Sequence, residues 1–326
     1  MADIIVIDQD LCLNFNYKKM TCQLCRSACP GGCINEELQI DSNCNGCGLC
    51  IAACPAEAVA GLGYTNRSIQ AWREGDLPVA IVCRKNESTS PWPCLGFLNS
   101  SLLLWAGSGN RSVVVDTTSC EGCKGGVFSH LQAAIDEANH IRRSLGSSEI
   151  RQGKTAAEGQ DKSITRRAFF GQLFGAAVDT VREVARPSDD KPERLERHQF
   201  ITAIKPALAE VALLKPTAAF SGLTISAACE ACGICAKFCT TKAITIRDRM
   251  DEIDIFHDPL KCTGCNVCAS HCPAQAITVG QAEKLASHTV ITARLPRCAR
   301  CDSLYQPVNH ATVCLECMLK SRPGVM

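Results

Sequence analysis

The sequence predicts an α+β protein in which two small cysteine-rich modules flank a small α/β domain, with a pair of cysteine knuckles near the C-terminus. Three observations support this prediction. The 326 residues include 25 cysteines, aromatic residues make up only 5% of the chain, and the spacing C-x2-C-x2-C-x3-C occurs three times. Because large apolar side chains are few, we expect bound metal to hold the small modules together.

Charge and hydropathy exclude several classes of protein. The 34 Lys and Arg residues balance 33 Asp and Glu residues, giving a formal net charge of +1 and no electrostatic basis for a nucleic-acid partner. The longest compact apolar run, residues 102–106, is far shorter than the roughly 20 residues of a membrane-spanning helix. The N-terminus lacks the basic segment of a secretory signal. We therefore expect a cytoplasmic protein with no integral membrane segment, whose cysteines are thiols or metal ligands.

The cysteine spacing defines two predicted modules, residues 1–62 and 219–290. The three regular runs span 44–54, 229–239 and 262–272. Three thiolates within seven residues can wrap one face of an iron–sulfur cubane, and the fourth can reach a second cubane. A zinc site normally uses two well-separated C-x2-C knuckles instead. The spacing therefore predicts iron–sulfur clusters.

These runs resemble the bacterial-type 2[4Fe-4S] ferredoxin family over about residues 1–62 and 222–280. Cys54-Pro55 and Cys272-Pro273 match the Cys-Pro ending of the family, whereas Thr240 follows Cys239. The resemblance implies crossed ligation, in which the fourth cysteine of one run binds the cluster of its neighbour. For the second module it implies the two ligand sets Cys229, Cys232, Cys235, Cys272 and Cys262, Cys265, Cys268, Cys239.

The first run of the N-terminal module is irregular, because Lys19 occupies the position of its first ligand. Cys12 and Cys33 are both candidates to replace it. Cys33 occupies a position where the other runs carry a small residue, Ala58, Ala243 or Ala276. Cys12 follows a short apolar strand and an Asp-started turn, as Cys44 and Cys262 do. We therefore assign one cluster to Cys12, Cys22, Cys25, Cys54 and its neighbour to Cys44, Cys47, Cys50, Cys29.

Residues 63–146 are predicted to form the small α/β domain. Residues 78–83 and 111–116 have the composition of buried strands, and the apolar stretch 98–105 favours a helix. A second helix is indicated by apolar residues at helical spacing before a Leu145-Gly146 stop. The order predicts a β-α-β-α unit with a parallel strand pair.

Four cysteines of this domain stand at predicted strand ends and helix starts, where ligands gather in α/β sheets. They are Cys83, Cys94, Cys120 and Cys123. Two spaced cysteines followed by a close pair loosely resemble the thioredoxin-like [2Fe-2S] ferredoxins, although the close pair here is C-x2-C rather than C-x3-C. A further iron–sulfur cluster, a zinc site, and buried thiols with a redox-active or idle C-x2-C all stay open.

Residues 147–218 are predicted to be a polar linker that contains one amphipathic helix at 170–184. The preceding Arg166-Arg167 pair looks like a twin-arginine export signal, but it lies in mid-chain. We instead expect this helix to dock on a ferredoxin module or a partner subunit.

The C-terminal segment, residues 291–326, resembles a zinc ribbon. Its two C-x2-C knuckles predict a structural zinc site, although a rubredoxin-like single iron would use the same ligands, Cys298, Cys301, Cys314 and Cys317.

We expect His310 to be a surface residue. His271, beside Cys272, is expected either to hydrogen-bond near a cluster or to be exposed.

No nucleotide-binding glycine motif, H-E-x-x-H motif or nucleophile elbow is present, so we predict no catalytic residue. We expect a multi-cluster iron–sulfur electron-transfer protein that relays single electrons to or from a larger redox enzyme complex. The subunits of that complex would be its electron donor and acceptor. An assembly or scaffold factor, and a reductase with chemistry at the Cys83/Cys94/Cys120/Cys123 site, are the alternatives.

Overall fold

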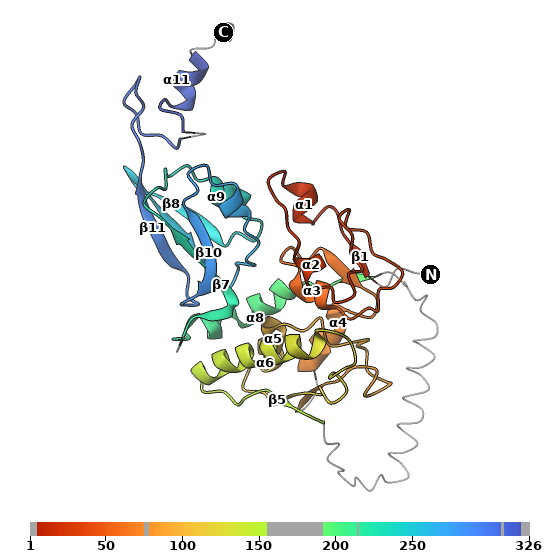
Figure 1. The fold of residues 1–326 in the computed structure, drawn as a ribbon. Coiled ribbons are helices and arrows are strands. Elements are labelled where there is room, and N and C mark those ends of the chain that lie inside the picture. The colour runs from red at the N-terminus through yellow and green to blue at the C-terminus, as the bar shows by residue number, and fades with distance from the viewer. Residues whose placement is uncertain (1–4, 75–77, 155–191, 214, 308–309, 321–326) are drawn as a thin grey trace, which may run out of the picture.

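The computed structural model describes residues 5–74, 78–154, 192–213, 215–307 and 310–320, which form small mixed sheets and short helices (Figure 1). The predicted helix at 170–184 and the Arg166-Arg167 pair lie outside the described residues. No helix among those residues is both long and apolar enough to cross a membrane.

The N-terminal module is a small antiparallel sheet carrying three short helices. Strand β1 (Ile5–Ile7) pairs with β2 (Val59–Gly61), and β6 (Glu193–Arg194) joins the other edge of β2. The cysteine loops between β1 and β2 contain α1 (Leu13–Asn16), α2 (Leu24–Ser27) and α3 (Leu49–Ala53). Because β1 and β2 pair with each other, both ends of this cysteine-rich segment are fixed to one sheet.

The middle of the chain confirms the predicted parallel pair. Strand β3 (Val79–Ile81) pairs in parallel with β4 (Val113–Val115), and β5 (Arg151–Gln152) joins β4. Helix α5 (Ser100–Ala106) connects β3 to β4, and Asn99 caps its N-terminus. Helix α6 (Val127–Ser144) ends where the sequence predicts, with Gly146 in the left-handed region at φ 64°. The segment before β3 contains α4 (Asn66–Gln70) and the 3-10 helix η1 (Ala71–Arg73).

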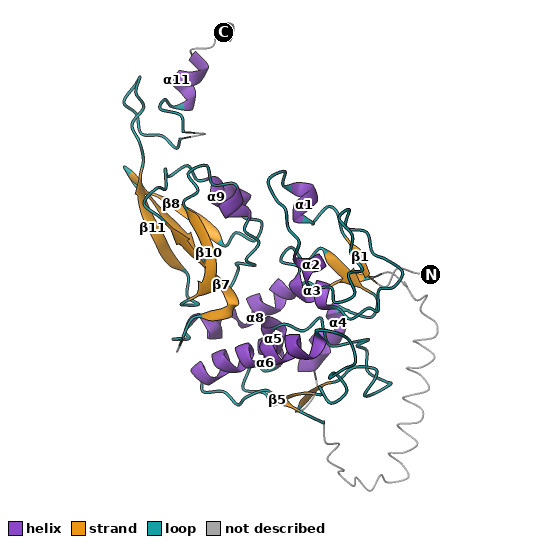
Figure 2. Ribbon diagram, in the orientation of Figure 1, coloured by secondary structure: helices purple, strands orange, loops and turns teal. Residues whose placement is uncertain are grey.

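The segment 147–218, predicted as a linker, contributes β5, β6, the start of β7 and a further helix. Helix α8 (Arg197–Ala209) buries Phe200, Ile201 and Ile204. The Phe200 ring lies 5.3 Å from the ring of Trp105, and Figure 2 shows α8 beside α5. A charged first turn and an internal Pro206 obscure the apolar face of this helix in the sequence.

The second module consists of two sheets and two short helices. Strand β7 (Thr217–Ile225) pairs antiparallel with β10 (Ile277–Ala282). The other sheet has the order β11-β9-β8 and contains β8 (Ile244–Asp248), β9 (Glu252–His257) and β11 (His288–Arg294). The cysteine loops carry α9 (Ile234–Phe238) and α10 (Val267–Ser270), and α11 (Leu315–Lys320) lies at the far C-terminal tip (Figure 1).

Two hydrophobic clusters support these parts. The larger runs from the first module through the α/β domain and α8 to β7, and the smaller lies within the second module. The four parallel or antiparallel sheets are short, so packing between them and the helices carries much of the stability.

Arg142 is a buried cation whose loss we expect to destabilise the α/β domain. It is only 2% exposed, and its guanidinium donates to the carbonyl oxygens of Ser148 (2.6 Å), Gly107 (2.5 Å) and Arg111 (3.0 Å). Arg142→Met removes these three hydrogen bonds, and we expect the free energy of unfolding to fall by about 3 kcal/mol in urea titrations. The control is Arg143→Met, because Arg143 is half exposed and pairs only with Glu149; its cost should be about 0.5 kcal/mol. Equal losses in the two variants would contradict this expectation.

Candidate iron–sulfur and metal centres

The first cysteine of each predicted run donates its backbone amide to a carbonyl three or four residues earlier. The amide of Cys12 donates to the carbonyl of Asp8 at 3.0 Å, and the amide of Cys262 donates to that of Asp258 at 3.2 Å. In the other two runs the bond spans three residues rather than four, from Cys44 to Asp41 (3.1 Å) and from Cys229 to Ser226 (3.1 Å). The turn at Cys12 therefore matches the turn at Cys262.

The fourth cysteine of each run accepts a hydrogen bond on its sulfur from the amide four residues later. The donor–sulfur distances are 3.3 Å for Cys33 to Cys29, 3.3 Å for Ala58 to Cys54, 3.2 Å for Ala243 to Cys239 and 3.4 Å for Ala276 to Cys272. The residue before each donor has a positive φ, at Gly32, Glu57, Lys242 and Gln275. This turn aims an amide at the sulfur, and such hydrogen bonds stabilise negative charge on a thiolate.

Three cavities are each lined by four of the cysteines that the sequence groups together. Two lie in the first module and one in the second. They contain Cys12, Cys22, Cys25, Cys54; then Cys29, Cys44, Cys47, Cys50; then Cys229, Cys232, Cys235, Cys272. The buried Cys33 also lines the second cavity. In each case the fourth cysteine of one run meets the first three of its neighbour.

The remaining set, Cys239, Cys262, Cys265 and Cys268, is held together in the second module. Burial and then the neighbouring Cys265 and Cys239 raise the pKa of Cys262 to about 11. Burial and then Cys265 and Cys262 raise the pKa of Cys268 to about 12. These thiols are therefore close enough for the charge of one to oppose ionisation of the next.

The environment of the cysteine cavities disfavours thiolates that bind no metal. Burial, followed by the charges of neighbouring cysteines, raises the pKa of Cys25 to about 11 and that of Cys235 to about 12. Four thiolates in a desolvated cavity repel one another, whereas a cationic iron core offsets their charge and binds them in the deprotonated form. The donor set and its electrostatics fit a thiolate-bound iron–sulfur cluster.

The four cysteines of the α/β domain also come together. Cys83, Cys94 and Cys120 are buried and Cys123 is exposed. Burial and then the other three cysteines raise the pKa of Cys120 to about 11. This group borders the second cavity of the first module, since Lys124 Nζ donates to the carbonyl of Asn45 at 2.7 Å.

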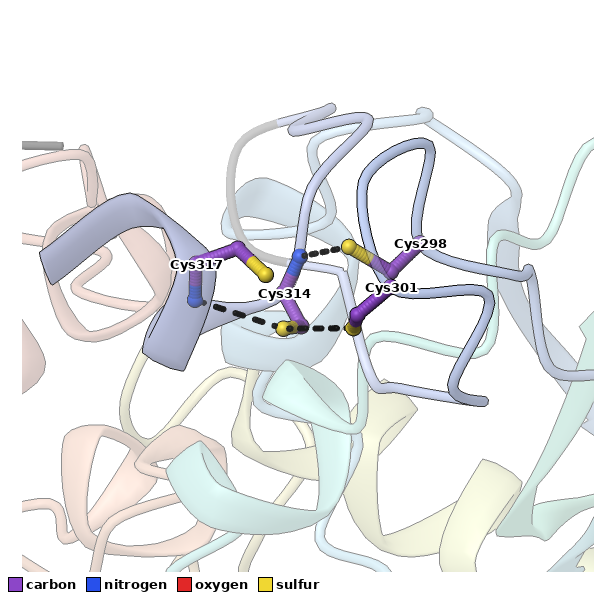
Figure 3. Close-up of side chains that lie close together, drawn as sticks. All are labelled: Cys298, Cys301, Cys314 and Cys317. Atoms are coloured by element: carbon purple, nitrogen blue, oxygen red, sulfur yellow. Dashed lines mark hydrogen bonds between the residues drawn. The ribbon is translucent and has the colours of Figure 1, made fainter. Parts of the chain in front are cut away.

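The C-terminal knuckles form a tighter group than the others. The sulfurs of Cys298, Cys301, Cys314 and Cys317 all lie within 4.8 Å of one another, and within the described ranges no other three His, Cys, Asp or Glu residues offer ligand atoms so close together (Figure 3). The Cys301–Cys314 sulfur separation is 3.7 Å. When four sulfurs surround one metal ion tetrahedrally with bonds of about 2.3 Å, neighbouring sulfurs lie about 3.8 Å apart. The spacing therefore suits one metal ion.

Backbone amides favour the thiolate form of Cys298 in this C-terminal group. The amide of Cys314 donates to the sulfur of Cys298 at 3.2 Å, and the amide of Arg300 donates to it at 3.5 Å. These bonds, that from Cys314 above all, lower the pKa of Cys298 to about 6. Cys298 is thus prepared to bind a cation, whereas hydrogen bonds with Cys301 and Cys314 raise the pKa of Cys317 to about 12.

The two histidines that the sequence singles out have different surroundings. His310 is half exposed, and its Nδ1 lies 2.6 Å from the Glu230 carboxylate, beside Cys229. His271 is partly buried, and its Nδ1 lies 3.0 Å from the carbonyl of Val267. Among the described residues, neither histidine belongs to a group whose ligand atoms lie close enough together to bind one metal ion.

Sequence reasoning missed one cation next to the cysteines. The buried guanidinium of Arg197 donates to the backbone carbonyls of Ala52 and Cys54 and lies 3.8 Å from the carboxylate of Glu57. The partners of Arg197 are far away in the sequence, and no spacing or periodicity could have indicated them.

Two similarities to known proteins are informative about the chemistry of these cysteine sets. Residues 228–276, which contain all eight cysteines of the second module, match the family described as the 4Fe-4S dicluster domain. This match supports an iron–sulfur ferredoxin character for the second module. Over 54 residues, 16% of this chain, the sequence is 39% identical to the pyruvate synthase subunit PorD of Methanothermobacter marburgensis. The match spans 58% of the length of that relative.

Gly96 is a point of close contact between the α/β domain and the first module. A Cβ atom at Gly96 would lie 2.4 Å from the carbonyl oxygen of Cys47. Gly96→Ala must displace the Cys47 loop, and we expect it to lower the free energy of unfolding by about 2 kcal/mol. Gly280→Ala is the matched control, because its Cβ would have no neighbour within 4 Å. Urea unfolding of the two variants measures the difference, and similar stabilities would show that the contact is dispensable.

Proposed function

We propose that this protein is a multi-cluster iron–sulfur electron-transfer protein that relays single electrons to or from a larger redox enzyme complex. The observation that carries the proposal is the crossed grouping of cysteines around separate cavities in both modules. When bound, thiolate-held cubanes supply reversible one-electron chemistry. The chain's own residues bind the clusters, shield them from water and donate amides to the sulfurs.

In this proposal residues 1–62 and 219–290 are two ferredoxin modules with four [4Fe-4S] clusters between them. The ligand sets are those predicted from the sequence, with Cys12 rather than Cys33 in the first cluster. Two observations support the choice of Cys12. Its amide bonds the carbonyl of an aspartate four residues earlier, as the amide of Cys262 does, and Cys12 lines the cavity that contains Cys22, Cys25 and Cys54.

We assign a further iron–sulfur cluster to the Cys83/Cys94/Cys120/Cys123 site and one Zn²⁺ to the C-terminal knuckles. The burial of three cysteines next to the first module supports the former assignment. The short sulfur separations and the amide bonds to Cys298 support the latter. A structural metal at the tip would supply folding energy to a segment with little core of its own.

The similarity to PorD supports a role as a subunit or partner of an oxidoreductase, because that relative is named as a subunit of pyruvate synthase. A reductase acting at the middle site would turn over substrate as an isolated chain. An assembly factor would keep its function after loss of the clusters. These two behaviours distinguish the alternatives from an electron relay.

The metal content of anaerobically purified protein tests the proposal directly. We expect a brown, oxygen-sensitive protein with about 16 Fe from four cubanes, additional iron from the middle site and about one Zn. Dithionite reduction should give paramagnetic signals of reduced clusters at cryogenic temperature. A colourless, folded protein that is rich in zinc and poor in iron would refute the electron-transfer function.

The two candidate ligands of the first cluster can be separated by substitution. Cys12→Ser should degrade one cubane and lower the iron content by about 4 atoms per chain. Cys33→Ala should leave the iron content unchanged, because the other three runs have alanine at this position and use only its amide. Anaerobic iron analysis with paramagnetic resonance measures both, and the opposite pattern would exchange the roles of Cys12 and Cys33.

A further inference from the structure

Helix α8 is attached to both ferredoxin modules through two cations. Near its N-terminus, Arg197 donates to the carbonyl of Cys54 in the first module. Near its C-terminus, the ammonium of Lys205 contacts the carboxylate of Asp258 in the second module. The carbonyl of Asp258 in turn accepts from the amide of Cys262. Eight residues of helix separate the two cations, or about 12 Å along the axis, so α8 acts as a strut of fixed length.

Cysteines that lie near the two ends of α8 line the same cavity. Cys54 and Cys262 both line a cavity of about 220 Å³, together with Arg197, His198 and Lys261. Cys54 belongs to the first cavity of the N-terminal module, whereas Cys262 belongs to the Cys239-containing set of the second. These two cysteine sets, of the four in the modules, therefore face each other.

Aromatic side chains of the two modules also pack against each other. We call the interface formed by these contacts and the shared cavity the junction. The ring of Tyr17, at the end of α1, lies 6.1 Å from Phe238 and 5.6 Å from His271, and these two rings are 4.8 Å apart. Ser270 Oγ donates to the sulfur of Met20 at 3.1 Å. Phe238 immediately precedes Cys239, so the contact reaches the backbone of a cluster-binding loop.

The two cysteine sets of each module lie on helices that contact each other. Helix α2, which carries Cys25, contacts α3, which carries Cys50. Helix α9, which carries Cys235, likewise contacts α10, which carries Cys268. The two sets of each module are therefore adjacent.

We propose that electrons pass between the two ferredoxin modules at this junction, with Tyr17, Phe238 and His271 as the packed contact and α8 as the strut that sets the spacing. The inference rests on the proposed electron-transfer function. In each transfer one cubane is oxidised by one electron and the cubane across the junction is reduced by one, without making or breaking a bond. Electronic coupling decays less steeply through packed side chains than across an open gap, so the loss of the ring slows this step.

The test uses the full-length protein with its clusters bound. A flash-excited ruthenium photoreductant delivers one electron, and rapid-freeze paramagnetic resonance follows its redistribution among the clusters. Tyr17→Leu should slow the phase that moves the electron between modules several-fold, while its iron content and the resting spectrum stay unchanged. Tyr17→Phe keeps the ring and should behave as the unsubstituted protein does.

A second pair of variants tests the strut separately. Lys205→Met removes the contact with Asp258 and should slow the same phase, whereas Lys205→Arg keeps a cation and should not. Unchanged redistribution in both Tyr17→Leu and Lys205→Met would overturn the proposed passage. An unsubstituted protein without iron or cluster signals would instead refute the electron-transfer function itself, so the two failures are distinguishable.

Discussion

Repulsion among thiolates in desolvated cavities is the constraint on which the rest of this structure depends. The pKa is raised both for Cys25, which is partly buried, and for Cys235, which is buried, so ionised sulfurs in these cavities need a cationic core to offset their charge. The turn that follows each fourth cysteine reduces the repulsion by directing an amide to the sulfur. Short strands and helices suffice for the modules because bound metal can replace much of the missing hydrophobic core.

Parts of the fold with a local signal could be predicted from the sequence. The parallel pair β3–β4 and the end of α6 at Leu145-Gly146 follow from apolar runs and a left-handed glycine, and the structure confirms both. The ferredoxin resemblance is confirmed for residues 228–276. The division of cysteines into ligand sets stays a prediction, although the cavities group them in the same way.

Features that depend on contacts between distant segments could not be predicted. Arg197 contacts the backbone at Cys54, and Tyr17 contacts Phe238 across two modules. Each of these contacts involves a single side chain, which leaves no spacing or periodic pattern in the sequence. Helix α8 was hidden for a related reason: its charged first turn and Pro206 resemble a linker, and its apolar face becomes meaningful only against α5.

The C-terminal knuckle is joined to the second module by the His310–Glu230 contact, and Glu230 is the residue next to Cys229. Movement of the knuckle pair would therefore be transmitted through Glu230 to the loop that carries Cys229.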